Sequence, residues 1–474
     1  MSVSMTGIYS QAQKLEDRSL TGRINRFLST PQYIMLVVLL AAISNIFSLE
    51  LAVYGMYTVL VVYICLFGTD MLPMTPIVIC CYVAPSAQNN PGREETSIFF
   101  PGHGGNLIVL YGAVIAAAVL YRLIRDRKQF FSQKYTLLPG LLILSAGYLL
   151  SGIGSDAYPA AIWQNLRFAL VQSCTLVLPY LLIAGGVKWE EARKDYFAWV
   201  GFCLGGALLL QIGWIYFSGN VVLDGVIHRT QIYTGWGMHN NLGNLLAMMI
   251  PFAFYLATKY RRGWIGTVVG SAFLVGVLLT CSRGSILMAA VVYVICVLLM
   301  LHYAKNRRNN FIAFVSVVCI LVLMFLLFHK QILQLFSDLL RRGTDPSGRH
   351  QIYSEGLKLF FRRPVFGNSF FSPGFMPWEW STTQFTEFLP SRWHSTIIQL
   401  LTSCGVVGLA AYGFHRIQTV RLFLKDHTKE KNFIGCSLLV LLCCSLVDCH
   451  FFNIGPVLFY AMGLAFGEHS HKSS

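Results

Sequence analysis

The residues of this chain whose types and positions best suit chemistry are two arginines and a histidine. Arg283 ends a long apolar stretch, and Arg349 and His394 lie in residues 329–394, the one long hydrophilic segment of the sequence. A charged side chain beside hydrocarbon is costly, so it usually has a task. Guanidinium groups suit the binding of anions, and a neutral imidazole can accept a proton near pH 7. The three residues therefore predict a site that binds negative charge and moves a proton.

Each of the three residues also has a simpler interpretation. Arg283 can anchor a helix end among phospholipid headgroups. Arg349 shares its segment with several other arginines, and His394 follows Trp393 as an ordinary interfacial histidine would. Position alone therefore does not separate a functional site from the usual residues of a membrane interface.

The composition places these residues in a membrane protein. Of the 474 residues, 55% are hydrophobic and only 12% are charged, and the mean hydropathy is +0.58. The net charge of +15 arises mainly from Lys and Arg in short turns between apolar runs, which membrane insertion explains, so we expect no nucleic-acid partner. The thirteen cysteines lie mostly inside apolar runs without a CxxC pair or histidines at ligand spacing, so no metal site and no cofactor are predicted.

The apolar runs predict an all-α, polytopic transmembrane bundle of about 12–14 helices with one long outer loop. Fourteen segments suit spans: 33–48, 50–67, 72–86, 105–122, 136–153, 163–186, 197–217, 241–258, 264–281, 285–303, 311–328, 395–413, 433–449 and 453–468. Most of the 36 Lys and Arg fall in alternate turns, including the cluster from Arg416 to Lys431. This asymmetry predicts that both termini are cytoplasmic, and that the Ser282-Arg283-Gly284 turn and residues 329–394 lie outside.

The domain organisation that follows is simple. We expect residues 1–32 to form a basic cytoplasmic N-terminus and residues 33–474 to form a single membrane domain. Within the outer loop, the apolar residues between Ile332 and Leu340 recur at helical spacing and predict a helix lying on the membrane surface. A second amphipathic stretch runs from Arg349 to Arg363, and Trp378, Trp380 and Trp393 then predict an irregular interfacial cap. Such a loop could cover a cavity at the membrane surface.

Four segments of the C-terminal half share their order and spacing with a known family. They are Arg229 with Gly235 and Asn240-Asn241, the run Leu279-Thr280-Cys281-Ser282-Arg283-Gly284, Gly348-Arg349 leading to Arg363-Pro364-Val365-Phe366-Gly367-Asn368-Ser369-Phe370, and His394 followed by Gly405-Val406-Val407-Gly408-Leu409. Over about residues 225–415 the chain thus resembles the O-antigen ligase and O-antigen polymerase superfamily of bacterial surface-polysaccharide enzymes. It departs from the family at Ser395 and Ser403, where an asparagine and an acid are usual.

The resemblance implies a membrane glycosyltransferase at the outer face of the bacterial cytoplasmic membrane. The reaction would be metal-independent and inverting, with a glycan on undecaprenyl diphosphate as donor and a glycan, lipid or protein as acceptor. Arg283 and Arg349 would meet the charge of the leaving diphosphate, and His394 would take the proton of the attacking hydroxyl. The absence of a DxD pair from the outer loop favours arginines over a metal ion.

Further residues are candidates for substrate binding. Arg229 would bind diphosphate or a lipid headgroup, and Asn240 and Asn241 would contact sugar hydroxyls, although Asn240 could simply cap the following helix. Tyr353 would stack on a sugar ring. Asp448 and His450 lie near the outer end of a late span and suit either a proton relay or a structural pair, of which we favour the structural pair.

The sequence leaves several alternatives open, one of which is a purely structural or receptor membrane protein that would not need Arg283, Arg349 and His394 to converge. Polymerase and ligase share the donor chemistry and differ only in the acceptor, so these residues do not separate them. A lipid-linked oligosaccharide flippase or another secondary transporter would also need basic groups for a diphosphate. A transporter should show internal pseudo-symmetry and charges along a transmembrane path, whereas the candidate residues gather on one face.

Overall fold

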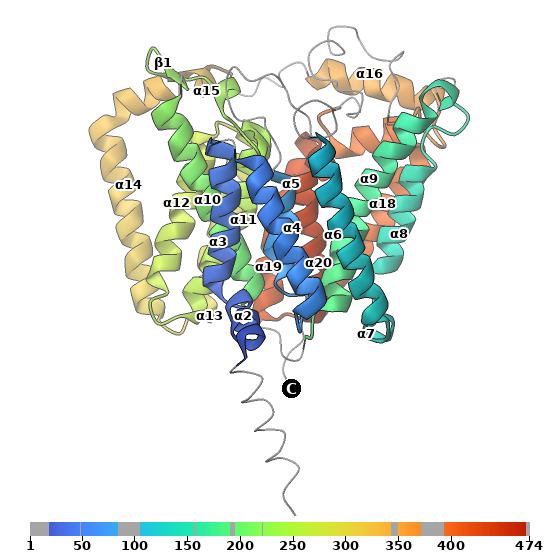
Figure 1. Ribbon diagram of the computed structural model, residues 1–474. Helices are drawn as coiled ribbons and strands as arrows, with labels where there is room; N and C mark the ends of the chain where they lie inside the picture. The colour runs from blue at the N-terminus through green and yellow to red at the C-terminus, as the bar shows by residue number, and fades with distance from the viewer. Residues whose placement is uncertain are drawn as a thin grey trace, which may run out of the picture.

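The computed structural model describes residues 19–47, 49–83, 105–155, 158–189, 195–219, 221–342, 349–370 and 393–470. These residues form eighteen α-helices and two small two-stranded sheets. Most helices run in parallel or antiparallel directions through one bundle, while α15 and α16 lie across one end of it (Figure 1). We call this the α16 end of the bundle. The predicted cap residues Trp378 and Trp380 lie outside the described residues.

The first half of the chain forms mainly helices that match apolar runs. They are α2 (Leu20–Leu28), α3 (Pro31–Phe47), α4 (Glu50–Phe67), α5 (Met74–Val83), α6 (Gly105–Arg125), α7 (Arg127–Ser132), α8 (Leu138–Leu149), α9 (Tyr158–Gly186) and α10 (Tyr196–Ser218). The short basic helices α2 and α7 lie at the end of the bundle opposite to α16 (Figure 1).

Two small hairpins interrupt the helices after α10. Strands β1 (Val222–Leu223) and β2 (Val226–Ile227) pair in antiparallel fashion, as do β3 (Tyr233–Thr234) and β4 (Gly237–Met238), with the 3-10 turn η1 (Arg229–Gln231) between the hairpins. Asp224 and Gly225 both have positive φ angles, 52° and 75°, which suit a two-residue hairpin turn. Strands of two residues show no hydrophobic period, so the sequence did not indicate them.

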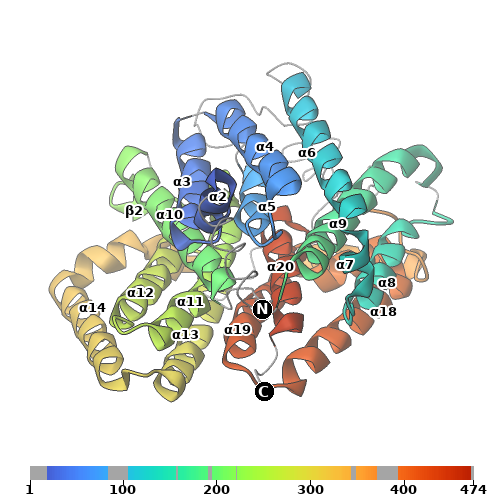
Figure 2. The same ribbon diagram turned by 60° about the horizontal axis from the view of Figure 1, so that its bottom comes forward.

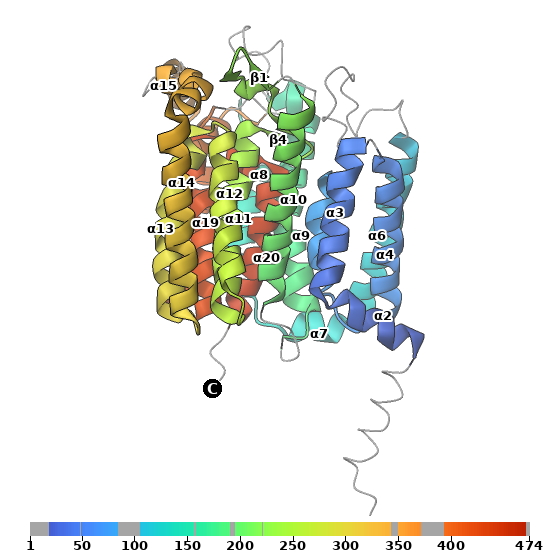
Figure 3. The same ribbon diagram turned by 90° about the vertical axis from the view of Figure 1, so that its left-hand side faces the viewer.

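The second half holds the longest helices. They are α11 (His239–Lys259), α12 (Trp264–Leu279), α13 (Arg283–Tyr303), α14 (Arg307–Leu335), α15 (Ser337–Arg342), α16 (Arg349–Arg362), α18 (Thr396–Lys425), α19 (Lys429–Val447) and α20 (Ile454–His469), with the 3-10 turn η3 (His450–Phe452) before α20. Helix α11 is buried along most of its length and lies inside the bundle with α19 and α20, whereas α14 stands exposed at the edge (Figures 2 and 3).

The bundle confirms a polytopic, mostly helical membrane protein, although the helices differ in length. Each of the fourteen predicted spans contains a helix, yet seven described helices are long and apolar enough to cross a membrane, or eight if the bent pair α2 and α3 forms one span. Helix α5 has 10 residues, which extend over about 15 Å, roughly half the hydrocarbon thickness. Apolar composition therefore located the helices without fixing which of them cross.

The outer loop begins differently from the prediction. The predicted span ended at residue 328, where the backbone of Phe328 indeed leaves helical geometry, but α14 continues to Leu335. The predicted surface helix between Ile332 and Leu340 is thus split between the end of α14 and the separate helix α15. The second amphipathic stretch forms α16, close to the predicted bounds.

Helix α18 also runs beyond its predicted end, and this corrects the position of one arginine. The span was expected to end at residue 413 and Arg416 to lie in a cytoplasmic cluster, but α18 continues to Lys425. Its backbone breaks at Gly405, with φ 64° and ψ −159°. The unbroken part of α18 runs from this break to Lys425. Arg416 therefore lies near the middle of this unbroken part, and not beyond the end of the helix as predicted.

Candidate active site

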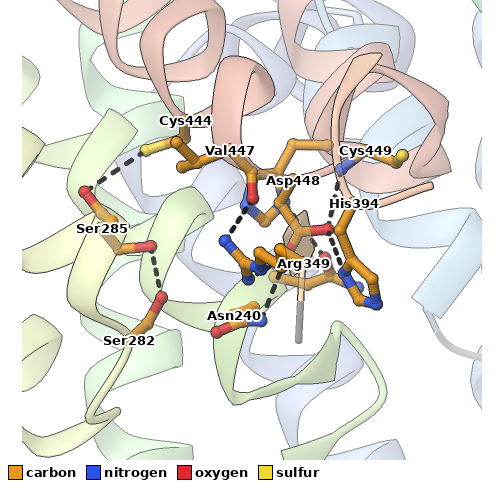
Figure 4. A network of polar contacts seen from close by, with 12 residues as sticks. Asn240, Ser282, Ser285, Arg349, His394, Cys444, Val447, Asp448 and Cys449 are labelled. Atoms are coloured by element: carbon orange, nitrogen blue, oxygen red, sulfur yellow. Dashed lines mark hydrogen bonds and ion pairs between the residues drawn. The ribbon is translucent and has the colours of Figure 1, made fainter. Parts of the chain in front are cut away.

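Asp448 lies at the centre of a polar cluster at the α16 end of the bundle. It directly follows α19, and its side chain is only 14% exposed. The carboxylate lies 3.4 Å from Nδ1 of His394 and 4.0 Å from Nη2 of Arg349, and it accepts a hydrogen bond of 3.0 Å from Nδ2 of Asn240. The four side chains point toward one another from different parts of the chain (Figure 4). The structure thus brings together two of the three predicted catalytic residues.

Arg349 is fixed by the end of a helix as well as by the carboxylate. It is the first residue of α16, and its Nη1 donates a hydrogen bond of 2.5 Å to the carbonyl oxygen of Val447, the last residue of α19. The last carbonyl groups of a helix have no partner within it and carry partial negative charge. A guanidinium group suits that position, so the end of α19 orients Arg349.

His394 occupies an unusual backbone conformation just before α18. Its φ angle is 49°, in the left-handed region that few residues other than glycine adopt. The Tyr353 hydroxyl donates a hydrogen bond of 2.8 Å to the His394 carbonyl oxygen, and the neighbouring Ser395 caps α18. The imidazole side chain is 41% exposed, so a substrate can reach it. Strained backbone held by its surroundings is common at functional sites.

The electrostatics of the cluster favour an ionised carboxylate. Burial raises the pKa of Asp448, but the hydrogen bond with His394 and the electrostatic influence of the nearby His450 and His394 imidazoles lower it more. The Cys449 backbone N–H, which donates at 2.7 Å, lowers the pKa further. The pKa of Asp448 therefore lies well below its ordinary value, and the group is an anion at neutral pH.

Arg283 begins a helix that lies next to this cluster. It is the first residue of α13, and the following residue, Gly284, packs against the end of α19. A Cβ atom on Gly284 would lie 3.1 Å from Cγ2 of Val447, and the Gly284 carbonyl oxygen lies 3.8 Å from Sγ of Cys444. Arg283 thus starts a helix whose first turn contacts the same helix end that binds Arg349.

The third and fourth sequence motifs dock onto each other. At the Gly405 break, the N–H groups of Val406 and Val407 donate to the carbonyl oxygens of Pro364 and Val365 at 2.8 and 3.2 Å. In the other direction, the N–H groups of Asn368 and Ser369 donate to Thr402 and Ser403 at 2.8 and 3.1 Å. The segment after α16 is therefore hydrogen-bonded to the broken part of α18, which fixes the helix carrying Arg349 relative to the helix that follows His394.

The other predicted binding residues have different positions. Nδ2 of Asn240 donates its hydrogen bond to Asp448. Oδ1 of Asn241 accepts a hydrogen bond of 2.5 Å from Asn453 and lies 3.2 Å from Nδ1 of His450. Both asparagines thus tie the first turn of α11 to the link between α19 and α20. Arg229 lies in the wall of a small pocket that Cys281 and Asp338 also line. Tyr353 is one helical turn from Arg349 and contacts the His394 backbone.

The central position of Asp448 in the cluster did not follow from the sequence. The expected pairing of Asp448 with His450 stays a prediction, and the partners that the structure gives Asp448 are Arg349, His394 and Asn240. An acid at the end of an apolar helix, on the same side as the candidate cations, was the signal available in the sequence. Among the described residues, no group of three or more His, Cys, Asp or Glu side chains could hold a metal ion.

A comparison with known protein families identifies a match in the second half of the chain. Residues 268–413 match the family model of O-antigen ligase. The matched segment holds Arg283, Arg349, Tyr353 and His394 together with the docked motifs, and it ends before Asp448. No curated protein matches the chain. The chain is therefore a multi-pass membrane protein whose residues 268–413 are similar to the O-antigen ligase family.

Proposed function

We propose that this protein transfers a glycan from undecaprenyl diphosphate to a hydroxyl group of an acceptor, at the outer face of the bacterial cytoplasmic membrane, with both chain termini cytoplasmic. The observation that carries the proposal is that Arg349 and His394 both contact Asp448. Arg283 begins α13, and the first turn of α13 packs against the end of α19 beside this contact. A cation for a diphosphate and a base for a hydroxyl thus lie within 4.0 Å of one buried carboxylate.

His394 acts as the general base in this mechanism. The Asp448 carboxylate lies beside Nδ1 of the imidazole, which favours the tautomer with the hydrogen atom on Nδ1 and leaves Nε2 to accept a proton. As the acceptor oxygen attacks C1 of the donor sugar, its proton moves to Nε2. The imidazolium that forms is stabilised by the Asp448 anion, as in other sites where a carboxylate orients a histidine.

The arginines act on the leaving group. The bond between C1 and the phosphate oxygen breaks, and its electron pair stays on the undecaprenyl diphosphate. A guanidinium group has five N–H donors, and the contacts of Arg349 to Val447 and Asp448 leave several for phosphate oxygens. Arg283 supplies a second cation from the start of α13. Attack opposite to the leaving diphosphate inverts the configuration at C1, and no step requires a metal ion.

The test is a complementation series in a strain that lacks this protein. Wild type, His394→Ala, Arg349→Ala and Arg283→Ala are expressed at matched membrane levels, and glycan length, glycan attachment and lipid-linked donor are measured. Arg341→Ala is the matched control, because this arginine lies in the same outer segment and its side chain is 85% exposed. We expect loss of transferred glycan and accumulation of donor on the outer leaflet in the three site variants alone.

The products also identify the reaction. Donor that carries single repeat units would indicate a polymerase, and long but unattached glycan would indicate a ligase. Donor that accumulates on the inner leaflet would identify a flippase and overturn the proposal. Normal glycan in all three site variants would remove the proposed site.

A further inference from the structure

Arg416 is a charged side chain near the middle of α18 that the proposed mechanism does not use. Its Nη1 donates a hydrogen bond of 2.6 Å to the hydroxyl of Tyr460 in α20, and its Nε and Nη2 atoms are buried. None of the described carboxylates pairs with it. A charge inside a membrane bundle is costly and is usually retained for a function.

Aromatic rings take the place of a carboxylate partner around this arginine. The guanidinium carbon lies 4.2 Å from the ring centre of Phe451, 4.4 Å from that of Tyr412 and 4.8 Å from that of Tyr460. The Tyr460 hydroxyl also contacts Nε2 of His415 at 2.8 Å. Cation–π contacts are strongest where water is excluded. Arg416 therefore joins α18 and α20 to the ring of Phe451.

Phe451 links this cage to the candidate active site. It is the middle residue of η3, three residues after Asp448, and it is fully buried. Its carbonyl oxygen accepts a hydrogen bond of 2.9 Å from Nε2 of Gln172 in α9. Two sets of contacts thus hold the link from Asp448 to Asn453. The asparagines of α11 contact Asp448, His450 and Asn453. Arg416 and Gln172 contact Phe451.

A purely structural cage would not need a charge. An apolar side chain of similar volume could fill the space between three rings without the cost of burying a guanidinium group. An apolar side chain could not donate a hydrogen bond to Tyr460 while it stacks on Phe451. These two contacts together require a planar group with N–H donors, such as a guanidinium group. The buried charge of Arg416 therefore indicates that Phe451 and the residues linked to it must keep a fixed position.

We infer that Arg416 is a positioning residue for the transfer reaction. Its stacking on Phe451 holds the link between α19 and α20 so that the Asp448 carboxylate stays between Arg349 and His394. This inference rests on the proposed function, because it assigns Arg416 an effect on that same site. It predicts that the effect of Arg416 on turnover passes through Asp448.

A double-mutant cycle tests this coupling. Wild type, Arg416→Met, Asp448→Asn and the double variant are purified in detergent, and turnover is measured per folded molecule with lipid-linked donor extracted from the deletion strain. We expect Arg416→Met to lower turnover about tenfold in the wild-type background and less than about twofold in the Asp448→Asn background. A purely structural role would lower turnover by the same factor in both backgrounds, and that result would overturn the inference.

Arg122→Met is the matched control. Arg122 is also a buried arginine in an apolar helix, but it bonds to the carbonyl oxygen of Gly68 at 2.5 Å and pairs with Asp126, within the N-terminal half of the chain. We expect Arg122→Met to lower the yield of folded protein and to leave turnover per folded molecule unchanged. An equal loss of turnover in Arg122→Met would show that any buried arginine has this effect, which would also overturn the inference.

A second variant keeps the test informative if Arg416→Met does not fold. Phe451→Leu removes the ring beneath the guanidinium group but leaves the Arg416 to Tyr460 hydrogen bond in place. The inference predicts the same loss of turnover and the same dependence on Asp448, and additivity of Phe451→Leu with Asp448→Asn would contradict it. Absence of transfer by the wild-type protein would instead refute the proposed function, so the two failures are distinguishable.

Discussion

Replacement of Gly405 by alanine should separate the two docked motifs and inactivate the protein. Gly405 has φ 64° and ψ −159°, a backbone region that is almost restricted to glycine. A Cβ atom at this position would lie 2.3 Å from the carbonyl oxygen of Val365 and 2.5 Å from that of Pro364. These two oxygens accept the hydrogen bonds from Val407 and Val406. The added methyl group would therefore occupy the space that the docked backbone needs.

The expected cost follows from these contacts. Forcing a residue with a side chain into this conformation costs about 1–3 kcal/mol. Loss of the two hydrogen bonds from Val406 and Val407 adds about 1 kcal/mol for each bond. We therefore expect Gly405→Ala to be destabilised by roughly 3–5 kcal/mol, with loss of the fixed relation between α16 and α18. Since α16 carries Arg349 and α18 follows His394, glycan transfer should fall with stability.

The same helix provides a matched control for this variant. A Cβ atom on Gly413 would meet no atom within 4 Å, so Gly413→Ala should be neutral or slightly stabilising. The assay is the apparent melting temperature of each detergent-purified variant, together with glycan transfer in the complemented deletion strain. If Gly405→Ala melts at the temperature of Gly413→Ala and transfers glycan normally, the docking of the motifs has no functional importance and the reasoning is wrong.

Two further predictions concern the chemistry of the site. Tyr353→Phe removes the hydrogen bond to the His394 carbonyl oxygen, a loss of about 1 kcal/mol, so turnover should fall about fivefold at an unchanged protein level. Unchanged turnover would show that the strained His394 backbone does not depend on this hydroxyl. Treatment of the purified protein with EDTA should leave transfer unchanged, because arginines and a histidine perform the proposed steps. A loss of activity that Mg²⁺ restores would contradict this mechanism.

The sequence predicted the helices better than it predicted their ends. Long apolar runs must form helices in a membrane because their backbone groups cannot bond to water there, and each predicted span contains a helix. Helix ends depend on tertiary contacts that a hydropathy window does not detect. The break at Gly405 is stabilised by the segment after α16, and Arg416 stays inside α18 because rings from η3 and α20 surround its charge.

The candidate site was predictable to the extent that it lies in local motifs. Arg349 and His394 were selected by their place in the family-like pattern, and the structure brings their side chains to one carboxylate. The role of Asp448 was not predictable, because it follows a different helix and its partners are known only once α16, α18 and α19 are packed. For Asn240, the sequence predicted the place at the start of a helix but not the hydrogen bond to Asp448.

The arrangement of helix ends suggests different contributions from the two arginines. Arg349 binds the negative end of α19 and lies beside the Asp448 anion, so much of its charge is already compensated. Arg283 starts α13, where its own charge and the positive end of the helix add. We therefore expect Arg283 to act mainly by attracting a diphosphate to this helix end, and Arg349 also to connect diphosphate binding to the carboxylate that orients His394. In the alanine series, Arg283→Ala should mainly raise the apparent KM for the donor, whereas Arg349→Ala should also lower kcat.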